Sequence, residues 1–226
     1  STGDGILMAQ AAGAKLVDMS AVEVVPFTGG RLTDFVGGDV WLNAEGRRFV
    51  SEGETFDVIR SAVEAQPEGR LWVVSDVKSN KGATLPVKLM SGTVASAESL
   101  EALAKALQVP FTTLSASIDR WNQSVKSGWD QDFNRPMPAQ AQTIDTPPFY
   151  YGEERLNIHS TEGGVAIDTQ ARVLDQSEEP LLGLFAAGET VGNLHGKSRP
   201  GGNGVLACVV FGRIAGQEAA QLSLSS

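Results

Sequence analysis

The sequence predicts a mixed protein of the α+β or α/β class, because short apolar strands alternate with helical patterns along its 226 residues. Residues 71–77 (LWVVSDV) give the clearest strand pattern, with the apolar and β-branched side chains that strands favour. Residues 183–216 add an apolar strand, a glycine-rich turn and a helix in direct succession. We therefore expect a fold in which strands and helices pack on one another.

The N-terminal part of the chain is expected to begin with a turn at residues 3–5 and a helix directly after it. Asp4 is placed to cap this helix or to accept a hydrogen bond, and a short strand is predicted at 16–19. Over residues 21–35, proline and glycine break any periodicity, so no element is predicted there. Residues 38–50 predict a hairpin, because two apolar runs flank a polar turn.

Three helices are predicted in the middle of the chain. Residues 55–65 and 96–107 have apolar side chains at helical spacing. A third helix is expected to be capped by Thr112 or Thr113 and to stop at Gly128. Their apolar faces indicate a core scaffold rather than a cofactor site.

A long connection is predicted over residues 130–148, which are polar and contain several prolines. We expect it to return the chain to a different domain. Residues 163–174 then predict a strand and turn region that leads into the glycine-rich segment.

The composition excludes several classes of function. A formal net charge of −9 argues against nucleic acid as a partner, since nucleic-acid binding demands basic patches. No apolar run approaches the length of a membrane span, so no membrane partner is expected. The single cysteine, Cys208, excludes an internal disulfide and a multi-cysteine metal cage, and we expect it to be a small core residue. The cysteine usage fits the cytoplasm and the periplasm equally.

The glycine-rich segment is the strongest candidate for a binding site. The strand at 184–187 is followed by Glu189 at its carboxyl end, where ligands of open α/β sheets bind. The helix expected from Asn203 onward begins with free backbone N–H groups, which suit an anionic or carbonyl-rich ligand. A tight connection is the alternative, but His195 and Arg199 stand among the glycines where a simple turn would use Asn, Asp or Pro.

Four blocks of sequence resemble the flavoprotein of the fumarate reductase and succinate dehydrogenase family, most nearly its soluble fumarate reductase branch. They are TGDGILMAQAAGAKLVDM at 2–19, VWLNAEGRRFVSE at 40–52, HSTEGGVAID at 159–168 and GLFAAGETVGNLHGKSRPGGNGVLACVVFGRIAG at 183–216. Their order and spacing make a far more specific signal than one glycine motif.

The resemblance implies an FAD domain interrupted by a capping domain. Residues 1–20 would end the first FAD-domain segment, 21–145 would form the capping domain, and 146–226 would be the C-terminal FAD-domain segment. The family's N-terminal Rossmann unit, with its GxGxxG turn, has no counterpart in this sequence. We therefore expect a fragment that needs this missing segment as a partner and that binds FAD poorly alone.

The resemblance also implies site residues for both ligands. The cofactor-binding positions are Asp4, Glu189, Gly201, Gly202, Gly204 and Val205. The substrate-binding positions are His159, from the family's HxTMGG block, Arg199, from HGxxRxGG, and the pair Thr33 and Asp34. His159 and Arg199 would hold a substrate carboxylate, with the arginine offering a two-pronged contact.

Three departures from the family bear on the chemistry. Val25 replaces the histidine of the QxHP motif, Gly37 replaces an arginine, and Phe56 stands where the family has its proton-donating arginine. Loss of that acid would cost about 10²-fold or more if proton transfer is part of the step. Arg60, one helical turn later, is a speculative substitute. The pattern therefore favours a substrate other than fumarate.

Two hypotheses follow for the function. According to the first hypothesis, the chain is part of an FAD-dependent oxidoreductase that exchanges hydride between flavin and a carbon–carbon bond next to a carboxylate or carbonyl. Its partners would be a small carboxylate or carbonyl substrate and the Rossmann segment, and the fragment alone could form a homodimer through its exposed apolar surface. The alternative is a non-catalytic binding or interaction module that keeps the fold without the chemistry.

Overall fold

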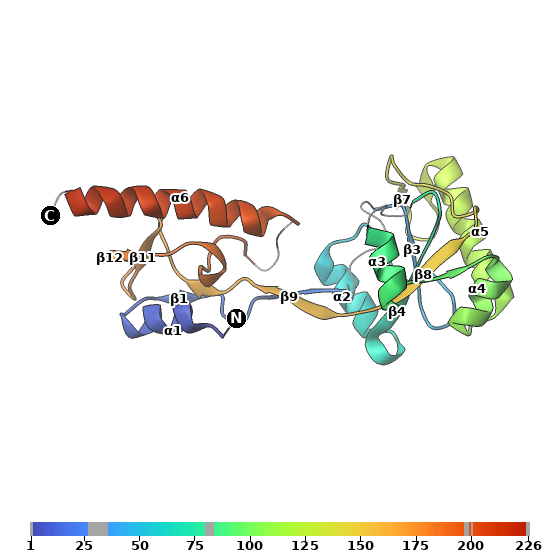
Figure 1. Ribbon diagram of the computed structural model, residues 1–226, viewed down its shortest axis with the longest axis horizontal. Helices are drawn as coiled ribbons and strands as arrows, with labels where there is room; N and C mark the ends of the chain where they lie inside the picture. The colour runs from blue at the N-terminus through green and yellow to red at the C-terminus, as the bar shows by residue number, and fades with distance from the viewer. Residues whose placement is uncertain (1, 27–35, 80–83, 197–198, 200, 225–226) are drawn as a thin grey trace. The chain divides into compact units, whose positions relative to one another are not determined.

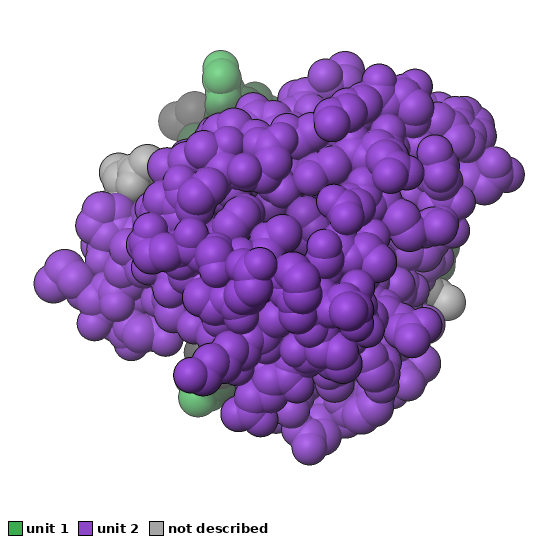
Figure 2. Space-filling view, turned by 90° about the vertical axis from the view of Figure 1, so that its right-hand side faces the viewer, with its two compact units in different colours: residues 1–24, 158–226 green, residues 25–157 purple. Residues whose placement is uncertain are grey.

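The computed structural model describes residues 2–26, 36–79, 84–196, 199 and 201–224 (Figure 1). They fall into two compact units, coloured separately in Figure 2. Unit 1 combines residues 1–24 with 158–226, and unit 2 is the stretch 25–157. The chain returns from unit 2 to unit 1 after residue 157, which is later than the expected boundary near residue 145. The reason is that residues 149–155 form a strand of the sheet of unit 2.

Unit 2 is built on a four-stranded sheet with the order β3-β4-β8-β5. The strands are β3 (Val40–Leu42), β4 (Arg70–Asp76), β8 (Phe149–Arg155) and β5 (Ala95–Ala97). Every neighbouring pair is antiparallel, and β4 pairs with β8 along its full length. The strand predicted from the LWVVSDV pattern is therefore confirmed as a central strand, β4.

Helices cover both faces of this sheet. Helices α4 (Leu100–Leu107) and α5 (Phe111–Ser127) pack against one face, where Val40, Leu42 and Val74 point. Helices α2 (Phe56–Glu64) and α3 (Thr84–Ser91) pack against the other face, where Trp41, Leu71 and Val73 point. Successive strand residues point to opposite faces, so cover on both sides explains why β4 is buried almost throughout.

The starts of two helices differ from the sequence prediction. Residues 95–97 form β5 because they pair with β8, so the helix predicted from 96 begins at Leu100, where Ser99 Oγ accepts a hydrogen bond from the Ala102 N–H. Helix α5 begins at Phe111 after Pro110, ahead of the two threonines. Its stop at Gly128 is confirmed, with φ of 73° at that residue.

The hairpin predicted at 38–50 is only partly formed. Strand β3 pairs with β4 rather than with the residues that follow it, and a single bridge joins Leu42 to Arg48. The polar turn between them is held by Asn43, whose side-chain oxygen accepts hydrogen bonds from the N–H groups of Glu45 and Arg47.

Short elements complete unit 2. They are the 3₁₀ turn η1 (Pro67–Gly69) and the paired strands β6 (Trp129–Asp130) and β7 (Arg135–Pro136). The predicted connection that contains β7 runs back along α5, where Trp121 Nε1 donates to the Gln142 carbonyl at 2.9 Å.

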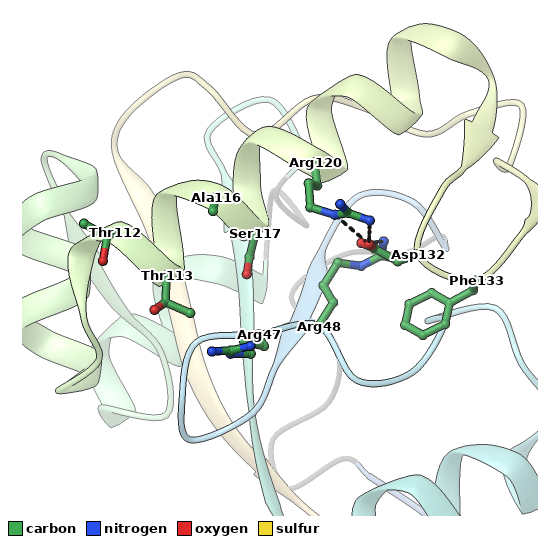
Figure 3. A pocket seen from close by; sticks show the side chains of 9 residues that line it. All are labelled: Arg47, Arg48, Thr112, Thr113, Ala116, Ser117, Arg120, Asp132 and Phe133. Carbon is green, nitrogen blue, oxygen red and sulfur yellow. Dashed lines mark hydrogen bonds and ion pairs between the residues drawn. The ribbon is translucent and has the colours of Figure 1, made fainter.

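A buried arginine joins separate parts of unit 2 (Figure 3). The Arg48 side chain is 2% exposed and forms ion pairs with Glu52 at 2.7 Å, Asp130 at 2.8 Å and Asp132 at 3.1 Å. Its guanidinium carbon also lies 4.8 Å from the centre of the Trp121 ring. Burial opposes the charge of Asp130, but its hydrogen bonds to Arg48 outweigh this, and the pKa of Asp130 lies below its usual value.

Unit 1 consists of short strands with a helix at each end of its sequence. Its elements are α1 (Asp4–Ala11), β1 (Leu16–Val17), β10 (Gly164–Val165), β11 (Arg172–Leu174), β12 (Pro180–Phe185), the 3₁₀ turn η2 (Gly188–Thr190) and α6 (Asn203–Leu224). Strand β1 pairs with β10, and β11 pairs with β12. Asp4 lies in the first turn of α1, but its side chain forms no capping hydrogen bond, so the predicted cap is wrong.

Glycines allow three backbone segments of unit 1 to lie unusually close together. A Cβ atom on Gly164 would lie 2.3 Å from the Thr190 carbonyl oxygen, and one on Gly163 would lie 2.3 Å from the Asp18 oxygen. A Cβ on Gly192 would lie 2.7 Å from a methyl carbon of Val17. Side chains at these positions would force the segments apart.

The chain passes between the units through β2 (Val22–Val25) and β9 (Asn157–Thr161), which are hydrogen-bonded to each other. Among the described residues, no helix is both long enough and apolar enough to span a membrane.

Replacing Arg48 by Met is expected to lower the free energy of unfolding by about 3–5 kcal/mol, because it leaves buried carboxylates without their cation. Urea unfolding followed by tryptophan fluorescence would measure the change. Arg60→Met is the matched control, since Arg60 forms only an exposed ion pair with Glu64, and it should show no resolved change. Equal stability of Arg48→Met and the wild type would contradict the role assigned to this network.

Candidate functional site

A cavity of about 170 Å³ in unit 1 brings together several of the predicted site residues. It lies where β9, η2 and the start of α6 meet. The lining residues are Ser160, Thr161, Glu162, Gly188, Glu189, Val191, Leu194, His195, Arg199, Gly204, Val205, Ala207 and Cys208. Four predicted site residues, Glu189, Arg199, Gly204 and Val205, are among them.

Two close approaches place η2 between the starts of α1 and α6. A Cβ atom on Gly5, next to Asp4, would lie 3.0 Å from Thr190 Oγ1. A Cβ on Gly188 would lie 3.3 Å from the Cys208 sulfur. The predicted cofactor positions Asp4 and Glu189 are therefore on neighbouring segments, although they are far apart in the sequence.

The start of α6 is open at Gly201 and Gly202, whereas the Arg199 guanidinium lies beside Gly204, where a Cβ atom would be 2.8 Å from its central carbon. A Cβ atom on Gly201 or Gly202 would meet nothing within 4 Å, and Gly202 has a φ of 87°. The first N–H groups of a helix have no acceptor within it and carry the positive end of the helix dipole. Thr190 Oγ1 nearby is buried without a hydrogen-bond partner among the described residues. These groups suit a ligand rich in oxygen acceptors.

Two of the four predicted substrate residues, His159 and Arg199, lie beside a pair of buried carboxylates. The Arg199 N–H donates to Glu23 Oε1 at 3.2 Å, and Arg199 Nε lies 3.7 Å from Glu162 Oε1. His159 Nε2 lies 3.9 Å from Glu23 Oε2. Ser160 Oγ lies within hydrogen-bond distance of both carboxylates. The structure thus brings His159 and Arg199 to one cluster.

Glu23 and Glu162 were not among the predicted site residues. A signal for them exists in the motifs, since Glu23 occupies the glutamine position of QxHP and Glu162 the methionine position of HxTMGG. Their side chains are each 2% exposed. Burial together with motif position therefore marks them as part of the site.

Cys208 corrects another expectation, because the predicted core residue is exposed. Helix α6 packs on the core of unit 1 through Phe211, Ile214 and Ala215, whereas Cys208 lines the cavity beside Gly188. Apolar residues on its remaining surface are open to solvent, including Val205 at 72% and Val209 at 65%.

A family model described as "FAD binding domain" matches residues 1–205. The chain belongs to this FAD-binding family. The match covers all of the cavity-lining residues except Ala207 and Cys208, and FAD is thereby identified as the cofactor. The predicted relationship to fumarate reductase flavoproteins and the predicted fold class are confirmed by the relatives described next.

Several curated relatives match almost the whole chain. A probable fumarate reductase, Ifc3, of Shewanella frigidimarina is 37% identical over 99% of this chain and 39% of its own length. An NADH:acrylate oxidoreductase of Vibrio harveyi is 34% identical over 97% of this chain and 23% of its own length. A urocanate reductase of Eggerthella lenta is 33% identical over 99% of this chain and 39% of its own length. The chain therefore spans about two fifths or less of these relatives.

Solved structures give the same relationship. The open conformation of a flavocytochrome c3 fumarate reductase matches with a TM-score of 0.73 and 37% identity, over 99% of this chain and 41% of that chain. A 3-ketosteroid delta1-dehydrogenase from Sterolibacterium denitrificans matches with a TM-score of 0.70 and 25% identity, over 100% of this chain and 47% of that chain.

The remaining predicted positions belong to unit 2. Thr33 and Asp34 lie outside the described residues. Phe56 begins α2 and packs against the apolar cluster of unit 2. Arg60 is exposed and pairs with Glu64 at 2.8 Å. Phe56 has an apolar side chain, and the Arg60 guanidinium lies on the surface. Neither residue is therefore a buried proton donor.

The backbone at Gly37 explains why the family arginine is absent there. Gly37 has a φ of 101°, and a Cβ atom on it would lie 2.8 Å from the Ala141 Cα. The Gly37 carbonyl also accepts a hydrogen bond from the Gln142 N–H at 2.9 Å, which holds the two loops together. An L side chain therefore does not fit at position 37 without movement of the 141–142 loop.

A second cavity lies in unit 2 and contains no predicted site residue (Figure 3). Its volume is about 550 Å³. Arg47 faces it from the turn after β3, and the hydroxyl residues Thr112, Thr113 and Ser117 face it from α5. Ser117 Oγ is already used, since it donates to the Gly46 carbonyl at 2.7 Å. The charged residues of its lining are three arginines, Arg47, Arg48 and Arg120, and one carboxylate, Asp132, which forms ion pairs with Arg48 and Arg120.

Gly37→Ala is expected to destabilise unit 2 by about 1–3 kcal/mol more than Gly69→Ala, because overpacking adds to the cost of positive φ. Gly69 also has positive φ, at 57°, but a Cβ there would meet nothing within 4 Å. It therefore shows the cost of a left-handed backbone angle at a position with room for a Cβ atom. Thermal or urea unfolding would measure both variants. If the two lost the same stability, contact with the 141–142 loop would not be what excludes a side chain at position 37.

Proposed function

We propose that this chain is part of an FAD-dependent oxidoreductase that exchanges hydride between the flavin and a carbon–carbon bond next to a carboxylate or carbonyl. The observation that carries the proposal is the meeting of α1, η2 and α6 at an open helix start beside the buried hydroxyl of Thr190. The match of residues 1–205 to an FAD-binding family supports it.

The proposed cofactor contacts divide by chemistry. Asp4 and Glu189 are carboxylates, suited to hydroxyl or ring N–H donors. Gly201, Gly202, Gly204 and Val205 offer backbone N–H groups, and the missing side chain of Gly204 leaves room for the Arg199 guanidinium beside them. When bound, FAD would supply the acceptor or donor of the hydride. The positive end of α6 would stabilise negative charge on a ligand held there.

His159 and Arg199 are the proposed substrate contacts. Arg199 offers a planar fork of N–H donors, which fits a carboxylate or carbonyl oxygen. His159 is half-exposed and within reach of the same cluster. Thr33 and Asp34 remain the proposed contacts for the other end of the substrate. We assign no proton donor, because Phe56 is apolar and Arg60 is held by Glu64.

The substrate of this chain is proposed to differ from fumarate. Relatives of similar identity are named for fumarate, acrylate and urocanate, and a structural relative is a 3-ketosteroid dehydrogenase. Membership of the family therefore leaves the substrate open. Gly37 and Phe56 stand at two positions where the resemblance implies an arginine. Without these two arginines, a site built for a dicarboxylate is less favoured.

The exposed apolar residues of unit 1 support a partner segment. Met8 on α1 is 73% exposed, and Val205, Leu206 and Val209 on α6 are each more than half exposed. Faces of this kind mark interaction surfaces. We propose that a Rossmann-type FAD-binding segment covers them, and that two copies of the chain associate through them when this segment is absent.

A non-catalytic binding module is the second candidate. The positions where the family carries its proton-donating and substrate-binding arginines hold Phe56 and Gly37, and Gly37 is fixed by its backbone. Such a module would keep the FAD site and lose the response of the flavin to small unsaturated acids and ketones.

Co-expression of the chain with a Rossmann-type segment that carries a GxGxxG turn is expected to yield a yellow complex with the absorbance of bound flavin. Glu189→Ala should remove the colour, because Glu189 is a proposed cofactor contact. Glu178→Ala is the matched control, since Glu178 is exposed and pairs with Lys15 away from the cavity. The same complex should protect Cys208 from a thiol reagent that modifies it in the chain alone.

Three results would count against this proposal. A colourless complex with intact circular dichroism would contradict the FAD site, and equal flavin content in the Glu189→Ala complex would contradict the role of that residue. A yellow complex whose flavin spectrum is unchanged by unsaturated acids and enones would favour the non-catalytic module. Light scattering of the chain alone checks the expected self-association, and a clean monomer would contradict it.

A further inference from the structure

Arg199 already has a carboxylate beside it, provided by the protein. The Nε atom of Arg199 lies 3.7 Å from Glu162 Oε1, and the side chains of both residues are buried, at 13% and 2% exposure. Ser160 Oγ donates to the same Glu162 oxygen at 2.6 Å and fixes the carboxylate in this position. Glu162 and Arg199 also line the same cavity.

Glu23 fixes the arginine from its other side. It accepts a hydrogen bond from the Arg199 backbone N–H at 3.2 Å, and its side chain is 2% exposed. This bond ties the loop that carries Arg199 to strand β2. The backbone of Arg199 is therefore held where its side chain can reach Glu162.

The pairing changes what Arg199 can attract. Water and salt screen buried charges weakly, so the charge of Glu162 acts strongly on a ligand in the adjacent cavity. It offsets the pull of the guanidinium on a second carboxylate and repels that carboxylate directly. The N–H donors of Arg199 that do not face Glu162 can still bind a neutral oxygen, such as that of an amide or ketone.

We propose that Glu162 is a specificity-determining residue that selects unsaturated carbonyl compounds with at most one carboxylate, whose neutral oxygen is bound by Arg199. This inference rests on the proposed function, because it assigns the substrate class of the same site. It depends on the charge of Glu162 at a position where the HxTMGG motif has an uncharged methionine.

The test uses the FAD-loaded protein with its Rossmann segment and three ligands of one shape. Fumarate, fumaramate and fumaramide share a skeleton and carry two, one and no carboxylates. Their dissociation constants are measured from the change that each causes in the flavin spectrum. The wild type should bind fumaramate more tightly than fumarate.

Glu162→Gln should lower the ratio of the dissociation constant of fumarate to that of fumaramate by about tenfold or more. The substitution removes the charge of Glu162 and keeps the shape of its side chain. Ser160→Ala, which keeps the charge and removes the hydrogen bond, should leave the ratio near that of the wild type. Glu178→Gln controls for loss of an exposed carboxylate. If Glu162→Gln does not accumulate with FAD, Glu162→Met carries the same expectation.

The outcomes separate this inference from the proposed function. Tighter binding of fumarate than of fumaramate by the wild type, or an unchanged ratio in Glu162→Gln, would overturn the role of Glu162 and leave the oxidoreductase proposal standing. A flavin spectrum that none of the three ligands changes would overturn the role of Glu162, and a spectrum that enones of other shapes also leave unchanged would count against the oxidoreductase proposal.

Discussion

The close approach of three backbone segments is the constraint on which unit 1 depends. Residues 163–164 pass between residues 17–19 and 190–192 with no room for a Cβ atom at either glycine. This contact fixes η2 next to β10, and η2 in turn lies against the starts of α1 and α6. The position of Glu189, of the Thr190 hydroxyl and of the open end of α6 therefore follows from packing that only glycine permits.

The site combines two opposite electrostatic environments. The start of α6 is exposed and positive in character, as an anionic or oxygen-rich ligand requires. The cluster around Arg199 is buried and contains two carboxylates, which is costly unless each is paired or hydrogen-bonded. Ser160 and the Arg199 N–H supply hydrogen bonds that offset this cost. The protein thus maintains negative charge within a few ångströms of the arginine on which substrate binding is proposed to depend.

Local pattern predicted some features and could not predict others. Strand β4 and helix α6 follow from β-branched content and from the glycine-rich turn, and both are present. Strand β5 was missed because Ala-Ser-Ala has little strand preference and is held only by pairing with β8. Glu23 was missed because its partner Ser160 is 137 residues away, and no local periodicity reports such a contact. The proposed substrate residues came from motif resemblance, and their roles remain predictions.

The pairing of β2 with β9 has a consequence for how such a chain can change over time. These strands are hydrogen-bonded neighbours, so the points where the chain leaves unit 1 and returns to it are held side by side. An insertion whose ends already meet can lengthen, shorten or be exchanged without altering the register of its host. Unit 2 can thus vary in length and sequence while the glycine contacts of unit 1 are preserved.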